Sequence, residues 1–548
     1  MADKTDFDLV PTGIISKELS WDGILRLHTQ LEGGGTATSI ALQRFSIKLA
    51  PGFMAVTFGD FDLSWTPFTL WNRDCDNDYF YTPGILERWN RYEKSPYFVD
   101  NSPDWPLRGV HGGTAVMWPN SEILDSFKVD VFAHMLRSAY SSGYMAFRYT
   151  GWIFGAMSEI KAKKYLSVGA YGIMLDEPLG TDDNVGTYKS FDSSTWAQRY
   201  TIGSLTPKLL FDINDDLSAG ANVEAAGANY WDDKHNEGRK VQDWSVYGGP
   251  FMKYKASTVA VNYLSVGYGF YSPMAQLRER DDLTGTITSH PVVLSEDVST
   301  DALGRPSALF KYYNRATDNV FPYGLATPNR KGFGGDFDFK ALPKDALFIK
   351  ARVYAVKEIT DNFVVNKAGT GFESVDETSS APLPKRKFTY VNVGPQLNIA
   401  SLLNWKRRLD AGFDVRSEST KSDIGTLNST MFQAGAGVGI KPWLDFEVAG
   451  RFGHAKGREA TLDGAYARTA YIYDNTDVGQ YTVTNFDGIY RMGAISFIFK
   501  IDKNSKLFVD AALEKTPCAV DNSDITPAYN TGLTLHKQTL DVIYEITF

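Results

Sequence analysis

The last stretch of the chain, residues 536–548, alternates between apolar and polar side chains with a period of two. One row holds Leu540, Val542, Tyr544, Ile546 and Phe548, and the other holds Thr539, Asp541, Glu545 and Thr547. Because successive side chains of a β-strand point to opposite faces of a sheet, the stretch predicts a strand with one apolar and one charged face. The same alternation recurs along the chain and constrains the fold more than any other feature.

Five other segments show the alternation clearly, with charges on one row and apolar side chains on the other: 127–135, 347–355, 409–416, 444–452 and 507–514. Strands of about 9–11 residues suit a membrane-crossing barrel, whereas strands of soluble sandwiches are usually nearer 5–6 residues. In segment 39–49 the apolar row changes phase, which predicts a bulge around Gln43–Arg44.

The connections between these segments alternate in length. Short turns are expected near 51–52, 119–125, 158–163, 213–216, 255–257, 342–345, 400–406, 441–443 and 501–505. Longer polar segments lie near 64–106, 177–195, 231–241, 272–330, 359–386, 420–428, 456–484 and 516–534. This order predicts about 20 strands (range roughly 18–22), with short turns at one end, long loops at the other and both chain ends on the short-turn side.

Composition agrees with strands that cross a membrane. Aromatic residues make up 14 % of the chain, glycine occurs 48 times and the mean hydropathy is −0.26. No run reaches the ~18–20 apolar residues of a spanning helix, which excludes a helical membrane protein. In lipid every backbone N–H and C=O must pair internally, and a closed barrel achieves this without edges. We therefore predict an all-β fold, a single large closed antiparallel transmembrane β-barrel; a multi-sandwich secreted protein or a β-helix is the alternative.

The C-terminal strand, with Tyr544, Ile546 and the terminal Phe548, resembles the closing strand of bacterial outer-membrane β-barrels. In those proteins the terminal Phe belongs to the signal read by the barrel assembly machinery. The whole chain resembles porins in architecture, without a match to one porin family. The resemblance implies an outer-membrane location, contact with lipid and lipopolysaccharide, periplasmic turns, extracellular loops, and a homo-oligomer or a surface or periplasmic partner protein.

The N-terminus lacks the basic start and apolar core of a secretory signal. We interpret the sequence as a mature chain whose signal peptide was removed, with residues 1–20 as a short periplasmic segment and 21–548 as the barrel. A TonB-dependent transporter is similar in size class but requires a globular plug before the first strand, for which these residues are too few.

The predicted function is passive diffusion of small hydrophilic solutes or ions through the lumen. Charged rings in a constriction decide selectivity in channels, and the alternative is that the charges only solvate the wall. Candidate pore-lining residues are Arg44, Lys48, Lys128, Asp130, Asp336, Asp338, Lys350, Arg352, Asp410, Asp414, Arg416, Asp445, Glu447, Arg451, Asp510, Asp541 and Glu545. In porins a long loop folds inward and narrows the lumen, and 64–106 and 272–330 are the candidates here.

Two other roles for a barrel remain open. A scaffold would bind a surface layer or partner protein through its loops. An export conduit for a polysaccharide would favour a lumen of one charge sign, and the mixed signs argue against it. Net charge is −9 without a basic stripe, so nucleic-acid binding has no support.

Smaller features suggest specific sites. One hypothesis is that Trp65, Phe68 and Trp71 line an aromatic track on which sugars stack. The alternative is that they pack within a loop or belong to an aromatic girdle at the membrane interface. The interfacial role is also expected of Trp118, Trp152 and Trp443. Cys75 and Cys518 lie in the first and last long loops, which are neighbours in a closed barrel, so a disulfide is expected outside the cytoplasm.

Metal and enzyme chemistry find little support. Asp74, Asp76 and Asp78 have the spacing that begins a calcium loop, but Tyr79 and Ile85 stand where an EF-hand needs Gly and Glu. An irregular calcium site remains the alternative to a solvated acidic loop, and no other cofactor is expected. No hydrolase or metalloprotease motif occurs. The glycines of 435–439 lack a strand–turn–helix context, so we expect close backbone approach or barrel curvature there rather than phosphate binding.

Overall fold

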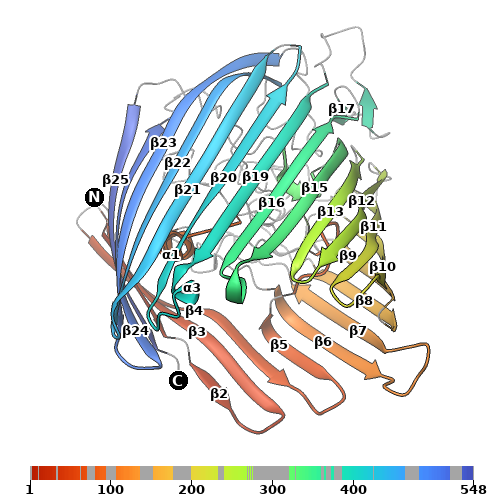
Figure 1. Ribbon diagram of the computed structural model, residues 1–548, viewed down its shortest axis with the longest axis horizontal. Helices are drawn as coiled ribbons and strands as arrows, with labels where there is room; N and C mark the ends of the chain where they lie inside the picture. Colours follow the sequence, from red (N-terminus) through yellow and green to blue (C-terminus); the bar gives the residue numbers. More distant parts are fainter. Residues whose placement is uncertain are drawn as a thin grey trace, which may run out of the picture.

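The alternating segments form one large antiparallel sheet, as Figure 1 shows in a computed structural model. The structure describes residues 3–9, 11–32, 35–61, 63–70, 80–93, 107–135, 152–163, 165–176, 199–231, 240–267, 270, 272, 275, 320–327, 329–359, 363–365, 372–374, 385–423, 425–462, 481–518 and 533–546. Within these ranges the sheet contains 22 strands. The predicted all-β antiparallel fold is confirmed.

The strands of the first half are β1 (Asp3–Leu9), β2 (Thr12–Ile14), β3 (Leu19–Glu32), β4 (Gly35–Leu49), β5 (Ala55–Phe61), β6 (Leu107–Met117), β7 (Ser126–Met135), β8 (Trp152–Ala162), β9 (Leu166–Asp176), β10 (Arg199–Asp212), β11 (Leu217–Trp231), β12 (Lys240–Tyr254) and β13 (Ser257–Val266). Those of the second half are β15 (Arg330–Ala341), β16 (Leu347–Lys357), β19 (Lys387–Asn398), β20 (Leu409–Lys421), β21 (Thr426–Lys441), β22 (Leu444–Leu462), β23 (Tyr481–Lys500), β24 (Ser505–Cys518) and β25 (Leu533–Ile546).

A few elements lie outside this sheet. Strand β14 (Pro322–Leu325) is separate from it, and β17 (Phe363–Val365) pairs with β18 (Phe372–Ser374) in a small sheet of their own. The helices are α1 (Gly84–Glu93), α3 (Ile399–Leu402) and the 3₁₀ turn η6 (Pro343–Asp345). Among the described residues no helix is long and apolar enough to cross a membrane.

The topology is a meander in which each sheet strand pairs with the next along the chain. Strands β1 and β2 both pair with β3, at its two ends, so they share one edge of the sheet. Strand β25 pairs with β24 and forms the other edge. The two edges lie beside each other, with Cα atoms of β1 and β25 within 8 Å (Figure 1). The sheet therefore curls so that its first and last strands come close to each other.

The direction of these two edge strands differs from the expectation. Because β1 and β2 share a position, the 22 strands occupy 21 positions, within the predicted range. Antiparallel pairing at every step makes β1 and β25 run the same way. Residues 1–20, expected outside the barrel, contribute both β1 and β2. The N-terminus consequently starts at the end of the long connections, and only the C-terminus lies at the short-turn end.

Most connection lengths follow the alternation seen in the sequence, but 33–34 and 422–425 are short although they lie at the end of the long connections. At one end the strands are joined by 15–18, 50–54, 118–125, 163–165, 213–216, 255–256, 342–346, 399–408, 442–443 and 501–504. At the other end they are joined by 33–34, 62–106, 136–151, 177–198, 232–239, 267–329, 358–386, 422–425, 463–480 and 519–532. Segment 136–151 was not anticipated, and the turn expected at 158–163 lies at 163–165.

The predicted bulge in β4 is confirmed. Ile24 pairs with Arg44 and Leu25 pairs with Leu42, which leaves Gln43 as the extra residue of β4. An added residue shifts the side-chain alternation by one position. This accounts for the change of phase in the sequence.

The sheet has two faces of opposite character. We call outer the face that carries the exposed apolar rows, for example Val131, Val353, Phe413, Val448 and Leu513. The residues next to them, including Asp130, Tyr354, Asp414, Glu447 and Asp510, are buried on the other, inner face. Helix α1 lies inside the curl of the sheet, against the inner face (Figure 1). The alternation read from the sequence thus separates the two faces correctly.

We predict that the N-terminal strand is part of the folded barrel. Deleting residues 3–9 removes the partner of residues 25–31 in β3, and the exposed ladder should lower the temperature at which the folded form unfolds. The measurement is the shift between the folded and unfolded bands on a gel after heating in detergent. Changing Asp3, Asp6 and Asp8 to Asn keeps the backbone and should leave that temperature unchanged. An unchanged temperature after the deletion would contradict the placement of β1.

Candidate functional site

The connection between β5 and β6 folds back onto the inner face. In its first described part, Phe68 has 0 % exposure and packs edge to face on Phe270, with ring centroids 5.5 Å apart. Trp65 packs on Phe132 of β7 at 5.2 Å and on Tyr171 of β9 at 5.9 Å. These rings join buried side chains of the inner wall in one apolar cluster. The residues 63–70 are therefore fixed to the wall by apolar packing.

A second connection, that between β13 and β15, adds to the same cluster. Phe321 packs on Tyr354 of β16 at 5.3 Å and on Tyr390 of β19 at 5.5 Å. The backbone N–H of Val320 donates to Glu418 of β20 at 3.0 Å. Both connections named as candidates for inward folding thus place described residues against the inner face.

A buried carboxylate holds the first part in place. Glu224 of β11 is buried, and its Oε1 accepts hydrogen bonds from the hydroxyls of Thr66, at 2.5 Å, and Ser204, at 2.8 Å. A buried carboxylate requires such donors because its loss of hydration is costly. Glu224 therefore couples residue 66 to the wall.

The second described part, residues 80–84, is held by its main chain. Asp414 Oδ2 of β20 accepts the backbone N–H groups of Phe80, at 2.7 Å, and Tyr81, at 3.3 Å. Gln396 Nε2 of β19 donates to the carbonyl of Phe80 at 2.8 Å. Gln433 Nε2 of β21 donates to the carbonyl of Tyr81. Three neighbouring strands thus recognise four consecutive polar groups of the segment.

Glycines in the wall make room for this segment. A Cβ on Gly394 would lie 2.6 Å from the Cβ of Phe80. On Gly412 it would lie 2.8 Å from the ring of Tyr81, and on Gly435 2.6 Å from Pro83. Real Cβ atoms do not approach this closely, so the segment lies where the wall lacks side chains. For Gly435 the expectation of close approach is confirmed.

The phenol of Tyr81 adds a further contact. Its hydroxyl donates to the carbonyl of Gly435 at 3.2 Å. Burial, reinforced by the negative charge of Asp410, raises the pKa of Tyr81 to about 12. Tyr81 lies in a connection rather than in a strand. With its pKa raised, the phenol keeps its proton, and with it this hydrogen bond, up to strongly alkaline pH.

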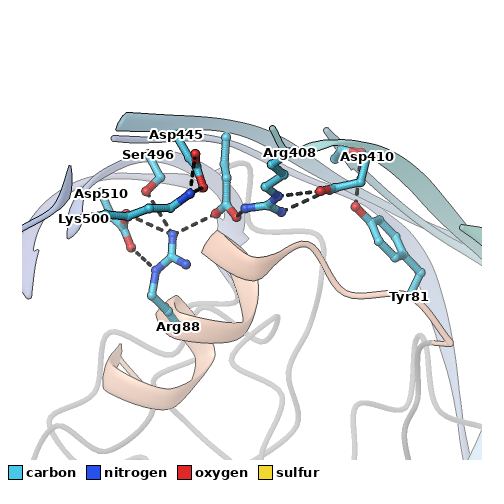
Figure 2. Close-up of polar contacts among 10 residues, drawn as sticks. Tyr81, Arg88, Arg408, Asp410, Asp445, Ser496, Lys500 and Asp510 are labelled. Carbon is cyan, nitrogen blue, oxygen red and sulfur yellow. Dashed lines mark hydrogen bonds and ion pairs between the residues drawn. The ribbon is translucent and has the colours of Figure 1, made fainter. Parts of the chain in front are cut away.

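Helix α1 is attached to the wall by one arginine, which Figure 2 shows pointing from the helix to the strands. Arg88 Nη2 lies 2.9 Å from Glu447 Oε2 of β22 and 2.9 Å from Ser496 Oγ of β23, and its Nε lies 2.9 Å from Asp510 Oδ2 of β24. The guanidinium also stacks over Phe508, 4.4 Å from the ring centroid. Arginine can make these contacts together because its planar fork carries five donors.

Further cations complete this row of charges. Figure 2 shows Arg408 beside Asp410, and it also pairs with Glu447. Lys500 Nζ lies 2.8 Å from Asp445 Oδ2. Acids of β20, β22 and β24 thus lie next to cations along the wall, and the charge of each is partly offset by its neighbour.

Most of the predicted pore-lining residues lie in inner rows. Lys128 pairs with Asp130 at 2.7 Å, and Arg352 pairs with Asp336 at 2.6 Å. The inner rows also hold Lys48, Asp338, Lys350, Asp410, Asp414, Arg416, Asp445, Glu447, Arg451 and Asp510. The side chains of Arg44, Asp541 and Glu545 lie outside what the structure describes. Sequence alternation therefore located the wall residues, and the structure adds that several are paired.

The smaller hypotheses have different outcomes. Phe68 is fully buried, so its ring offers no free surface for a sugar, while Trp71 lies outside the described residues. Cys75, the side chain of Cys518 and the aspartates 74, 76 and 78 also lie outside them, as do Phe548 and the side chains of Tyr544 and Ile546. The disulfide, the calcium site and the assembly signal stay predictions.

Several residues of the site were not predicted. Gln396 and Gln433 lie in the alternating polar rows but carry no charge, so a search for charged rings omits them. Arg88 lies in a connection with no strand pattern. A signal was available in GILERWNRYE, where the apolar and charged residues recur at helical spacing.

Comparison with known proteins gives similarity in fold. No family model matches the chain, and no curated protein matches it. The copper transporter OprC is 8 % identical, with a TM-score of 0.48 over 100 % of this chain and 79 % of that one. The outer membrane protein OprD from Pseudomonas aeruginosa is 12 % identical, with a TM-score of 0.35 over 77 % and 86 %. OmpT, an outer membrane protein of Vibrio cholerae, is 9 % identical, with a TM-score of 0.23 over 90 % and 94 %.

These solved structures are outer-membrane β-barrel proteins, the class that the sequence resembles. The present chain, in its described residues, has a large antiparallel sheet. At such identities the likeness concerns the fold alone.

We predict that Arg88 holds α1 against the wall. In a chain with Cys75→Ser and Cys518→Ser, a cysteine at the buried position Ile85 should react slowly with a maleimide. Arg88→Met leaves Glu447 and Asp510 without this cation, and the labelling rate should rise about tenfold or more, since each factor of ten corresponds to about 1.4 kcal/mol. Lys500→Met removes a neighbouring cation that pairs with Asp445, and it should leave the rate unchanged. Equal rates for both variants would contradict this role of Arg88.

Proposed function

We propose that the chain is a bacterial outer-membrane channel, a porin-like barrel for passive diffusion of small hydrophilic solutes or ions. The observation that carries the proposal is the opposite character of the two faces of the sheet. Apolar side chains such as Val353, Phe413 and Val448 are exposed on the outer face, and charged pairs occupy the inner face. Lipid outside and water inside are the solvents that match these faces.

The short-turn end supports a membrane boundary. Exposed aromatic side chains lie in or next to the short connections there, at Phe53, Trp118, Tyr165, Tyr254, Trp405 and Trp443. Lysines accompany them, with Lys255 Nζ 5.3 Å from the ring centre of Tyr254 and Lys441 Nζ 5.3 Å from that of Trp443. Amphipathic rings and lysine stems prefer the interface between hydrocarbon and water. This end is then the periplasmic one, and the long connections are extracellular.

The inward-folded part of the connection between β5 and β6 affects the width and the ion preference of the proposed channel. Residues 63–70 and 80–93 occupy the lumen side of the sheet, so the passage is narrower than the barrel itself. The wall charges that they approach are largely paired, through Arg88, Arg408 and Lys500. We infer a channel with a size limit and modest ion preference. No catalytic activity is part of this function.

The same proposal includes the surroundings of the barrel. Lipid and lipopolysaccharide cover the outer face, and the C-terminal strand is read by the assembly machinery during insertion. A homo-oligomer or a surface or periplasmic partner is compatible with the fold.

The test is single-channel conductance of the purified protein in a planar bilayer with a salt gradient. We expect discrete steps of constant size and a small reversal potential, because acids and cations on the wall offset each other. Folded, heat-modifiable protein that inserts but never conducts would refute the channel.

A specific observation favours a second function, that of a closed scaffold. Phe68, Phe270 and Phe321 form an apolar core with the inner wall, which fills part of the lumen instead of leaving it to water. A barrel plugged in this way would act through its long connections, by binding a surface layer or partner protein. The conductance measurement separates the two functions.

We also predict that an arginine introduced on the outer face lowers the free energy of unfolding by an amount that depends on its position along the strand. Val353→Arg, near the middle of β16, should destabilise the folded barrel by about 2–4 kcal/mol, while Ile501→Arg in a short turn should cost about 0–1 kcal/mol. Both side chains are exposed, so a protein surrounded by water would tolerate both. Reversible unfolding by denaturant in lipid vesicles measures the two values. Equal costs would exclude lipid contact at residue 353.

A further inference from the structure

The inner wall holds a short segment of the chain by its main chain. Three side chains of adjacent strands, Gln396, Asp414 and Gln433, point at one path along the wall, and three glycines at 394, 412 and 435 deepen it. We call these six residues the cradle. Its occupant is the chain's own segment, residues 80–84.

The contacts are of a kind that recognises backbone rather than sequence. Asp414 binds the N–H groups of Phe80 and Tyr81, while Gln396 and Gln433 bind the carbonyls of the same two residues. Gln433 Nε2 also contacts the hydroxyl of Thr82 at 3.1 Å. Asp414 and Gln433 each have 0 % exposure. Charge-assisted bonds from a carboxylate to backbone N–H groups are stronger than neutral ones, so Asp414 is the dominant member.

The occupant also contacts the cradle's floor. The ring of Tyr81 covers Gly412, and Pro83 covers Gly435, the carbonyl of which accepts the Tyr81 hydroxyl. Any side chain on this floor would push the segment into the lumen. The glycines therefore set how far the segment stands out from the wall.

Two other attachments flank the cradle along the chain. The Phe68 cluster lies before it and Arg88 lies after it. Losing the cradle therefore does not detach the whole connection. It frees residues 80–84, which can then leave the wall and return.

We propose that the cradle is a peptide-backbone binding site and that its occupancy by residues 80–84 sets the size limit of the channel. The proposal rests on the proposed channel function. According to this proposal, Asp414 determines which solutes pass. It acts by fixing the position of residues 80–84 and does not itself contact the solute. In the occupied state the segment lies flat against β19–β21, and in the vacant state it samples the lumen.

The experiment compares variants of Asp414 in planar bilayers. Asp414→Ala should change the fraction of time spent in a second conductance level by about tenfold or more, as expected when a charge-assisted hydrogen bond is lost. It should also change the largest polyethylene glycol that enters the pore. Asp414→Asn keeps one acceptor oxygen and should lie between Ala and wild type.

The matched control is Asp410→Ala. Asp410 lies on the same strand, in the same inner row and with the same charge, but it pairs with Arg408 and makes none of the backbone contacts to residues 80–82. It should change ion preference slightly and leave the second level and the size limit unchanged. If Asp414→Ala fails to fold, as read from heat modifiability, the pair Gln396→Ala and Gln433→Ala takes its place with the same expectation.

A labelling rate reports the position of the segment directly. In the chain without Cys75 and Cys518, a cysteine replacing the buried Pro83 should react slowly with a maleimide. Asp414→Ala should raise the labelling rate about tenfold or more, and Asp410→Ala should leave it unchanged.

The outcomes distinguish this proposal from the proposed function. A wild-type protein that folds but never conducts refutes the channel and the size limit with it. The maleimide labelling rate of the cysteine at position 83, compared with and without Asp414→Ala, then still measures binding in the cradle. A wild-type protein that conducts, with Asp414→Ala identical to Asp410→Ala, overturns the role of the cradle and leaves the channel standing.

Discussion

The main-chain hydrogen-bond ladder is the constraint on which the rest of the structure depends. A strand in hydrocarbon has no water to satisfy its N–H and C=O groups, so each strand needs a partner on both sides. Pairing between neighbours along the chain gives every sheet strand from β3 to β24 a partner on both sides. Alternation then follows, because a paired strand shows one face to each solvent. The period of two in the sequence reflects these two faces, one apolar and one polar.

The inner face shows a second consequence. Lumen walls that meet only water can stay polar, but here Ile153, Ile173, Leu264 and Val266 are buried on the inner face. Such side chains favour apolar contacts. The inward segments provide them through Phe68, Phe270 and Phe321. The apolar part of the wall is therefore kept from water by the inward-folded connections, and those connections are in turn held in place by packing on the wall.

The fold could be predicted from the sequence to a large extent because it depends on local alternation. Rows such as those around Asp130, Asp414 and Asp510 identify the inner face without any knowledge of distant contacts. The bulge at Gln43 was visible for the same reason. Strand β1 was missed because its apolar row is short: Phe7 lies between Asp6 and Asp8, and Leu9 follows Asp8. Its place in the sheet comes from β3, which a local pattern does not contain.

The candidate site could not be predicted in this way. Phe80 meets Asp414 across 334 positions of the sequence, and Arg88 meets Asp510 across 422. No periodicity reports such contacts, since they arise only when the sheet has curled around the segment. Two local signals were present, the helical spacing around Arg88 and the glycines of the wall at 394, 412 and 435. A glycine in a strand predicts that another part of the molecule approaches closely. Neither signal indicates that the approaching group is the main chain of residues 80–84, because that depends on contacts between distant parts of the sequence.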